Sequence, residues 1–348
     1  MIWLTWRQFR GQAWVASATL VVMAVALTLT GLHLGHMFGI SGIATCHTRG
    51  DCASVSTTFI NQVQANSTYK VFNTGMVILY GAPALIGIFW GAPLVSREFE
   101  AGTFRLAWNQ SVTRTRWLAA KLALLGLAAI VTTGLLSLML SWWASPIYRA
   151  AALADGSNGG AGPNHLDPLL FGASGIAPVG YAAFAFALGV TLGALIRRTI
   201  PAMAATLAVF AAALLTMSLW IRPRLVTPVH MISALNPANI DGVNIQAGGR
   251  MLLTAAVSKP SGLVVSSQII DTSGRVFTGP PTQACESATA SFQACSASIA
   301  RLNLRQLVSY QPASRYWMFQ WYETAIFLGL GLALAAFCFW WIGRRRLS

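Results

Sequence analysis

Six long apolar runs divide this sequence, and each is long enough to cross a lipid bilayer as a helix. Crossing the hydrocarbon core takes roughly 20 apolar residues. Composition agrees, because 55% of the 348 residues are hydrophobic and only 9% are charged, whereas a soluble domain carries about 25% charged residues. The sequence therefore predicts an integral membrane protein. The six runs cover about residues 14–38, 71–96, 118–143, 176–196, 200–221 and 322–342.

The basic residues lie beside the apolar runs and predict the orientation of the chain. The net charge of +14 could suggest a nucleic-acid partner, but the arginines flank spans and form no dense patch, so we expect none. Short loops on one side hold Arg7, Arg10, Arg97, Arg105, Arg114, Arg116, Arg197, Arg198, Arg344, Arg345 and Arg346. The short loops opposite hold only Arg49, Lys70 and Arg149. The positive-inside rule then predicts that both termini are cytoplasmic.

The predicted fold is an all-α membrane protein of six transmembrane helices, with a small mixed extracytoplasmic domain between helices five and six. Residues 1–221 would hold the first five spans, an N-terminal interfacial helix and a cytoplasmic coupling segment over 97–116. Residues 222–321 would form the outer domain, and residues 322–348 the sixth span with a basic cytoplasmic tail. Within the outer domain, residues 262–270 are strand-like. An amphipathic helix is predicted where four residues follow one another at helical spacing: Phe292, Cys295, Ile299 and Leu302.

The cysteines agree with this topology. Cys46 and Cys52 share the first outer loop, and Cys285 and Cys295 share the outer domain. Two local pairs outside the membrane predict disulfides of an oxidising compartment. On one continuous helix Cys285 and Cys295 would lie ~15 Å apart, so the chain must turn between them if they pair. Cys338 lies in the sixth span and should stay reduced.

Several kinds of chemistry have no sequence support. None of the three lysines follows a glycine, so a phosphate-binding loop of the Gly-Lys-Ser/Thr type is excluded. The spans carry no acidic residue away from their ends, with Glu323 at the boundary of the last, which disfavours an ion-coupled carrier. His33 and His36 lie one turn apart without a third ligand nearby, so we expect no metal site. No catalytic motif is present, and we expect no cofactor in this chain.

Glycines repeat every four residues in three of the spans. They are Gly31, Gly35 and Gly39 in the first, Gly87 and Gly91 in the second, and Gly189 and Gly193 in the fourth. Such stripes let helix backbones approach closely. We expect contacts inside the helix bundle more than contacts between subunits.

The segment that follows the second span carries two carboxylates within three residues, although the whole chain has only 9 acidic residues. One interpretation is a solvated turn whose arginines fix orientation. The other is a short helix over residues 98–108 along the membrane surface, which passes motion to a partner protein. In that helix Glu98 and Glu100 would lie near the start, where the helix dipole favours acids, and Arg105 near the end. Phe99, Gly102 and Leu106 would share one face.

The same segment resembles one found in a known transporter family. The run Arg97-Glu98-x-Glu100-x-Gly102-Thr103, followed by residues 109–114 and Lys121, is similar to the segment after the second span of ABC-2 type ABC transporter permeases. Asn109 stands where that family commonly has Thr. Six spans, and residues 310–317 before the last span, resemble permeases of actinobacterial type. The residues that the resemblance assigns to coupling with the ATPase subunit are Glu98, Glu100, Gly102, Thr103, Arg105, Trp108 and Arg114.

The resemblance implies a permease subunit that forms a homodimer in the plasma membrane and exports a hydrophobic or amphipathic substrate. ATP and Mg would be bound by a separate ATPase subunit, and lipid would surround the spans. One alternative is a membrane-anchored extracytoplasmic binding or sensor protein, in which the spans serve only as anchors. A secondary carrier is a second alternative. The sequence leaves the substrate open, and the direction of transport rests on the resemblance alone.

Overall fold

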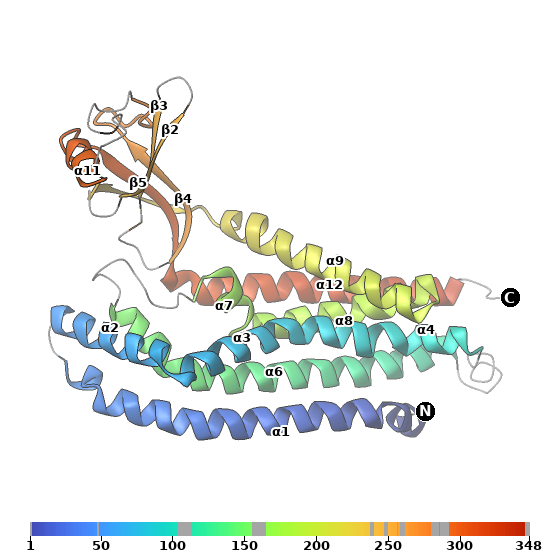
Figure 1. Ribbon diagram of the computed structural model, residues 1–348. Helices are drawn as coiled ribbons and strands as arrows, with labels where there is room; N and C mark the ends of the chain where they lie inside the picture. Colours follow the sequence, from blue (N-terminus) through green and yellow to red (C-terminus); the bar gives the residue numbers. More distant parts are fainter. Residues whose placement is uncertain are drawn as a thin grey trace.

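The computed structural model shows a long bundle of helices with a strand region at one end (Figure 1). Both termini lie at the opposite end of the bundle, which we call the basic end because Arg97, Arg197 and Arg344 lie there. The end that carries the strands is called the strand end. The structure describes residues 2–46, 49–102, 113–154, 165–236, 240–246, 250–255, 257, 262–279, 285 and 292–344.

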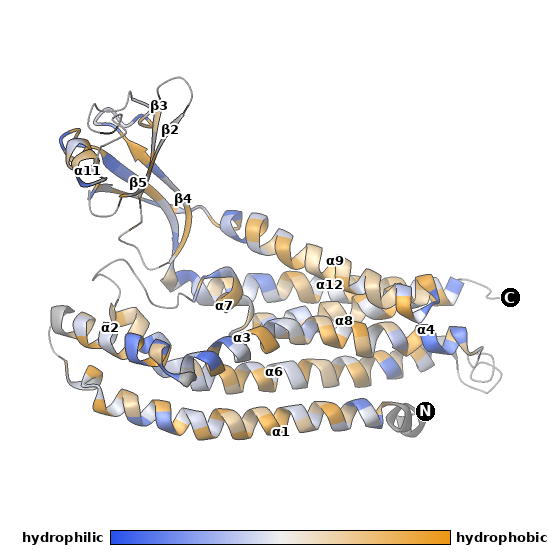
Figure 2. Cartoon of the chain, viewed as in Figure 1, coloured by the Kyte–Doolittle hydropathy of each residue, from blue (hydrophilic) through white to orange (hydrophobic). Residues whose placement is uncertain are grey.

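Within the described residues, six helical segments are long and apolar enough to cross a membrane, as the sequence predicts. The second is two helices joined end to end, and the chain runs α1 (Ile2–Ile40), α3 (Ser67–Ile86) with α4 (Ala92–Glu100), α6 (Arg114–Ala154), α8 (Ala177–Ile196), α9 (Thr199–Thr216) and α12 (Tyr316–Arg344). Figure 2 shows apolar residues along the middle of these helices and hydrophilic ones toward their ends. The predicted N-terminal interfacial helix was based on Trp3, Trp6, Arg7 and Arg10, and these residues belong to the same continuous helix as the first span.

Helix α8 forms the core of the bundle. In its most apolar stretch 72% of the residues are buried, compared with 6% in that of α1. Helices α3, α4, α6, α9 and α12 all pack against it. Since lipid tails are as apolar as leucine, helices in a membrane associate through close packing and hydrogen bonds. The central position of α8 explains why its sequence is apolar or small on every side.

Glycines let α8 approach the second span closely, as their spacing predicts. A π-helical turn, Gly87–Gly91, joins α3 to α4. A Cβ atom at Gly189 would lie 2.3 Å from the Gly87 carbonyl oxygen, and one at Gly193 would lie 2.5 Å from the Ala92 carbonyl oxygen. These two stripes therefore pack inside the bundle. The stripe in α1 is mixed, because a Cβ at Gly31 would lie 2.9 Å from the Trp143 side chain, whereas one at Gly35 or Gly39 would meet nothing within 4 Å.

Two helices at the strand end were not predicted. Helix α2 (Arg49–Ala65) lies between the first two spans and packs against the end of α6, where that helix continues past the predicted span. Its Phe59 and Val63 are buried with Trp143 and Tyr148 of α6. A short helix, α7 (Pro168–Gly172), precedes α8. The helical spacing of Val55, Phe59 and Val63 is the sequence signal that could have identified α2.

The strand region contains two small antiparallel sheets. Strands β1 (Val229–Ala234), β5 (Arg305–Pro312) and β4 (Gly262–Ile270) form one sheet in the order β1-β5-β4. Strands β2 (Ile240–Gln246) and β3 (Arg250–Ala255) form a hairpin. Helix α11 (Phe292–Ala300) buries Cys295 and Ile299 against Ile240, Met251 and Ile269. The predicted strand at residues 262–270 is confirmed, and the predicted helix ends before Leu302.

The structure joins the cysteines in the two expected pairs. The Cα atoms of Cys46 and Cys52 are 5.3 Å apart, and those of Cys285 and Cys295 are 4.7 Å apart. Cys285 lies before α11 and Cys295 within it, so the chain turns between them. Cys338 is free and buried in α12. Whether the two pairs are oxidised in the native protein stays a prediction.

Buried polar side chains attach the strand region to the bundle. Arg222, just after α9, donates from Nε and Nη2 to the Glu323 carboxylate of α12, each at 2.9 Å. The Tyr181 hydroxyl of α8 donates to the same carboxylate. Arg222 and Glu323 are fully buried. Because α12 begins at Tyr316, Glu323 lies within the last spanning helix and not at its boundary, where the sequence placed it. Removing one partner of such a pair typically costs about 3–5 kcal/mol.

Gln320, one turn before Glu323, joins three helices at the same end. Its amide nitrogen donates to the carbonyl oxygens of Phe171 and Ser174, both at 3.1 Å. Its amide oxygen accepts from the backbone N–H groups of Ile176 and Ala177, at 3.0 and 2.7 Å. The side chain thereby pairs free backbone groups where α7 ends and α8 begins, which a membrane protein must do internally.

Substitution of Gly189 by Ala should destabilise the bundle. The added Cβ would overlap the Gly87 carbonyl oxygen at 2.3 Å, and overpacking of this kind costs typically ~1–3 kcal/mol. Gly329→Ala is the matched control, because a Cβ there would meet nothing within 4 Å. The thermal unfolding midpoint of the purified protein should fall for the first variant only. Equal midpoints in both variants would contradict the close approach.

Candidate functional site

Helix α4 ends inside the segment that the sequence analysis assigned to coupling. Its last residue is Glu100, and Gly102 follows with a φ of +67°. The Ala101 N–H donates to the Arg97 carbonyl oxygen at 3.0 Å, and the Gly102 N–H donates to that of Phe99 at 3.4 Å. A glycine in the left-handed conformation just after a helix is a common way to end it.

The predicted helix over residues 98–108 is therefore wrong in its first part. Glu98 and Glu100 lie in the last turn of α4, not near the start of a new helix. The dipole of α4 consequently disfavours both carboxylates, opposite to the prediction, and other groups must stabilise them. The backbone conformation alone accounts for a glycine at position 102, since a positive φ is costly for other L-residues.

Glu100 caps the start of helix α9. The Thr199 backbone N–H donates to one carboxylate oxygen at 2.9 Å, and the Thr199 hydroxyl donates to the other at 2.6 Å. The first N–H groups of a helix lack partners within it, and its dipole favours an anion there. The Ser96 hydroxyl lies 3.0 Å from the Thr199 hydroxyl. Helix α4 is thereby joined to the turn between α8 and α9.

The turn between α8 and α9 is tight and basic. Arg197 ends α8 with a φ of 57°, a left-handed conformation that is uncommon outside glycine. Its guanidinium carbon lies 5.5 Å from the centre of the Phe99 ring, within the range of a cation–π contact. The turn therefore contacts α4 through both a carboxylate and an aromatic ring.

Glu98 joins α4 to α6. Its carboxylate accepts a hydrogen bond from Lys121 Nζ, and the two form an ion pair. The Lys121 side chain is only 3% exposed, and its ammonium lies 4.6 Å from the centre of the Trp117 ring. Because the pair lies mostly out of water, its attraction is little screened. Two acids two residues apart in sequence thus join one helix end to two different spans.

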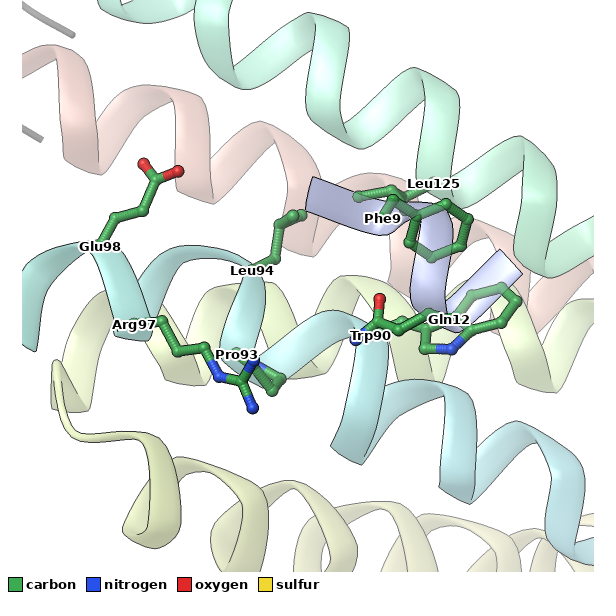
Figure 3. A pocket seen from close by; sticks show the side chains of 8 residues that line it. All are labelled: Phe9, Gln12, Trp90, Pro93, Leu94, Arg97, Glu98 and Leu125. Carbon is green, nitrogen blue, oxygen red and sulfur yellow. The ribbon is translucent and has the colours of Figure 1, made fainter. Parts of the chain in front are cut away.

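A cavity of about 240 Å³ lies beside these residues, between α1, α4 and α6. Figure 3 shows its side chains: Phe9 and Trp90 meet on one side, and Arg97 and Glu98 lie toward the end of α4. The rings of Phe9 and Trp90 contact edge to face, with centroids 5.0 Å apart. The cavity is therefore apolar within and charged at one end.

The structure brings together only part of the predicted site. Glu98, Glu100 and Gly102 lie at the end of α4, while Thr103, Arg105 and Trp108 lie outside the described residues. Arg114 begins α6. Ser96, Trp117, Arg197 and Thr199 contact the site and were not predicted. Sequence alone offers a weak signal for Thr199, as a residue that follows two arginines between two apolar runs.

One comparison with known proteins gives a match. The profile of a family described as ABC-2 membrane transporter related matches residues 17–222. This is more than half of the chain and reaches from α1 to the end of α9, including the candidate site. No curated protein and no solved structure matches the chain.

Replacing Glu98 with Gln should destabilise the protein, because Lys121 would keep its charge in a buried position without a partner. Loss of one member of a buried pair costs about 3 kcal/mol or more. Replacing both residues, as Glu98→Gln with Lys121→Met, should restore most of the stability. Thermal unfolding of the two single variants and the double variant measures the coupling energy. Purely additive effects would show that the ion pair does not stabilise the bundle.

Proposed function

The chain belongs to the ABC-2 membrane transporter related family, and we propose that it is the permease subunit of an ATP-binding cassette exporter. Membership of this family and the six apolar helices found among the described residues indicate a multi-pass membrane transporter. The proposal adds that a separate ATPase subunit binds ATP and Mg and hydrolyses the nucleotide. Two copies of the permease would form the transport pathway in the plasma membrane, for a hydrophobic or amphipathic substrate.

One observation carries this proposal: the end of α4 is joined at once to α6 and to α9. Glu98 pairs with Lys121, and Glu100 caps α9 at Thr199. A force applied to the segment that follows Gly102 would reach both spans through these contacts. Helix α9 leads directly to Arg222 and the strand region at the other end. This is the connection that a permease driven from outside its own chain requires.

The orientation of the basic end is part of the proposal. The arginine distribution supports a cytoplasmic location for both termini and the α4 end, and an outer location for the strand region. The two cysteine pairs support the same orientation, because disulfides persist in oxidising compartments. A membrane-anchored sensor is the alternative, but the buried polar contacts among α8, α9 and α12 exceed what anchoring alone needs.

A cysteine placed at position 271 should react with a membrane-impermeant reagent in intact cells, and one at position 100 should not. Asp271 lies in the strand region and Glu100 at the basic end, on opposite sides of the bilayer by the proposal. Mass spectrometry of non-reduced peptides should also find Cys46 joined to Cys52 and Cys285 to Cys295. Labelling at position 100 alone, or free thiols at all four positions, would contradict the orientation.

Substitutions at Glu100 and Gly102 test coupling. Glu100→Ala should insert normally but lower substrate-stimulated ATP hydrolysis, because α9 loses its contact with α4. Gly102→Asn and Gly102→Leu form a matched pair of similar size. Asn tolerates positive φ better than Leu, so Asn should keep more co-purifying ATPase if only the turn matters. Equal loss in both would indicate that the partner's surface approaches Gly102 closely.

Thr28→Val on α1 is the control for membrane insertion, since the exposed Thr28 hydroxyl donates to Ala24 of its own helix and the residue lines neither cavity. Co-purification of the ATPase subunit and hydrolysis should match those of the unchanged protein. If Glu100→Ala and both Gly102 variants also match, the α4 end plays no part in coupling.

A further inference from the structure

A groove open to the bilayer runs between α1, α3 and α6. Its volume is about 360 Å³, and apolar side chains form most of its lining. Val15 and Ala16 of α1 face Ile78 and Leu85 of α3 across it. A Cβ atom added at Gly11 in its wall would meet nothing within 4 Å. The groove therefore has the width and polarity for an alkyl chain from the membrane.

The groove adjoins the cavity at the basic end. Gln12 and Trp90 line both, so the two spaces share a wall. The Gln12 amide donates to the Phe89 carbonyl oxygen at 2.8 Å, which fixes this side chain against the π-helical turn. Side by side, the two spaces extend from the apolar groove to the charged groups at the end of α4.

The charged end favours an anion. Glu98 is already paired with Lys121, so its negative charge is compensated. Arg97 is exposed and lines the cavity. Figure 3 shows its side chain folded back along α4 toward Pro93, on the side of Gln12 and Trp90, whereas Glu98 points away. Arg10 is exposed on α1 one turn from this opening and adds positive charge.

We propose that these two adjoining spaces bind an anionic amphiphile from the membrane, with its alkyl chain in the groove and its negatively charged head beside Arg97. A phospholipid with a net negative head has this chemistry, and a cation near an anionic membrane surface contributes about 1 kcal/mol. The inference concerns binding to this chain alone and goes beyond the transport function proposed above. It holds or fails without ATP and without an ATPase subunit.

The test uses the full chain in vesicles that contain a photoactivatable phosphatidylglycerol with its reactive group near the end of an alkyl chain. A phosphatidylcholine analogue with the same chains is the neutral comparison. Peptides from α1, α3 and α6 that line the groove should be labelled about fivefold more by the anionic lipid than by the neutral one. This factor corresponds to the contribution of about 1 kcal/mol from one cation. Equal labelling by both lipids would overturn the proposal.

Two pairs of variants test the contact with the lipid head and the contact with the alkyl chain separately. Arg97→Gln should bring the ratio of anionic to neutral labelling to about one, whereas Arg116→Gln, an exposed arginine outside the cavity, should keep it. Gly11→Phe should lower labelling by both lipids, whereas Gly35→Phe, equally free of neighbours on the same helix, should not. Unchanged labelling in Arg97→Gln and Gly11→Phe would overturn the proposal.

Two further measurements exclude other occupants. Glycerol 3-phosphate in solution should not compete with the labelled lipid, because it lacks the chain; effective competition would indicate a simple anion site and overturn the proposal. Val15→Cys should give little disulfide-linked dimer in vesicles. Efficient cross-linking at that position would show that a second copy covers the groove, which also overturns it. The Arg97 ratio stays informative even if Gly11→Phe fails to fold.

Discussion

The close approach of α8 to the second span is the contact on which the rest of the structure depends. Gly189 and Gly193 lie against Gly87 and Ala92 with no room for a Cβ atom. Because apolar side chains gain little by leaving lipid for protein, close packing such as this backbone contact must hold much of the bundle together. The same contact holds α4 beside α8, and so places Glu100 within reach of the start of α9.

Polar contacts at the two ends of α9 complete this arrangement. Glu100 satisfies the helix start at Thr199, and Arg222 just beyond its other end is paired with Glu323. Each contact joins α9 to a helix from elsewhere in the chain, and the buried Arg222 is paired where an isolated charge would be costly. The helix between them buries one stripe, which includes Phe210 and Leu214, against the bundle and is otherwise largely exposed. The contacts at its ends therefore add to this packing in setting its position.

The sequence was sufficient for the spans, the glycine contacts and the strand at residues 262–270, because each rests on a local period. It was not sufficient for contacts between distant charges. Glu323 looked like a boundary residue, since nothing local indicates that Arg222 reaches it from 101 residues away. The end of α4 was misplaced for a related reason. Amphipathic spacing continued past Gly102, whereas the backbone there adopts a positive φ that stops the helix.

The separation of Arg222 from Glu323 also has a consequence for biosynthesis. At roughly 5–20 residues per second, translation adds the intervening 101 residues in about 5–20 s. During that time Arg222 lacks the carboxylate that pairs with it, and the helices made so far lack α12. Only the arrival of α12 completes the pair. Truncation before residue 323 would therefore leave the nascent chain with an unpaired Arg222.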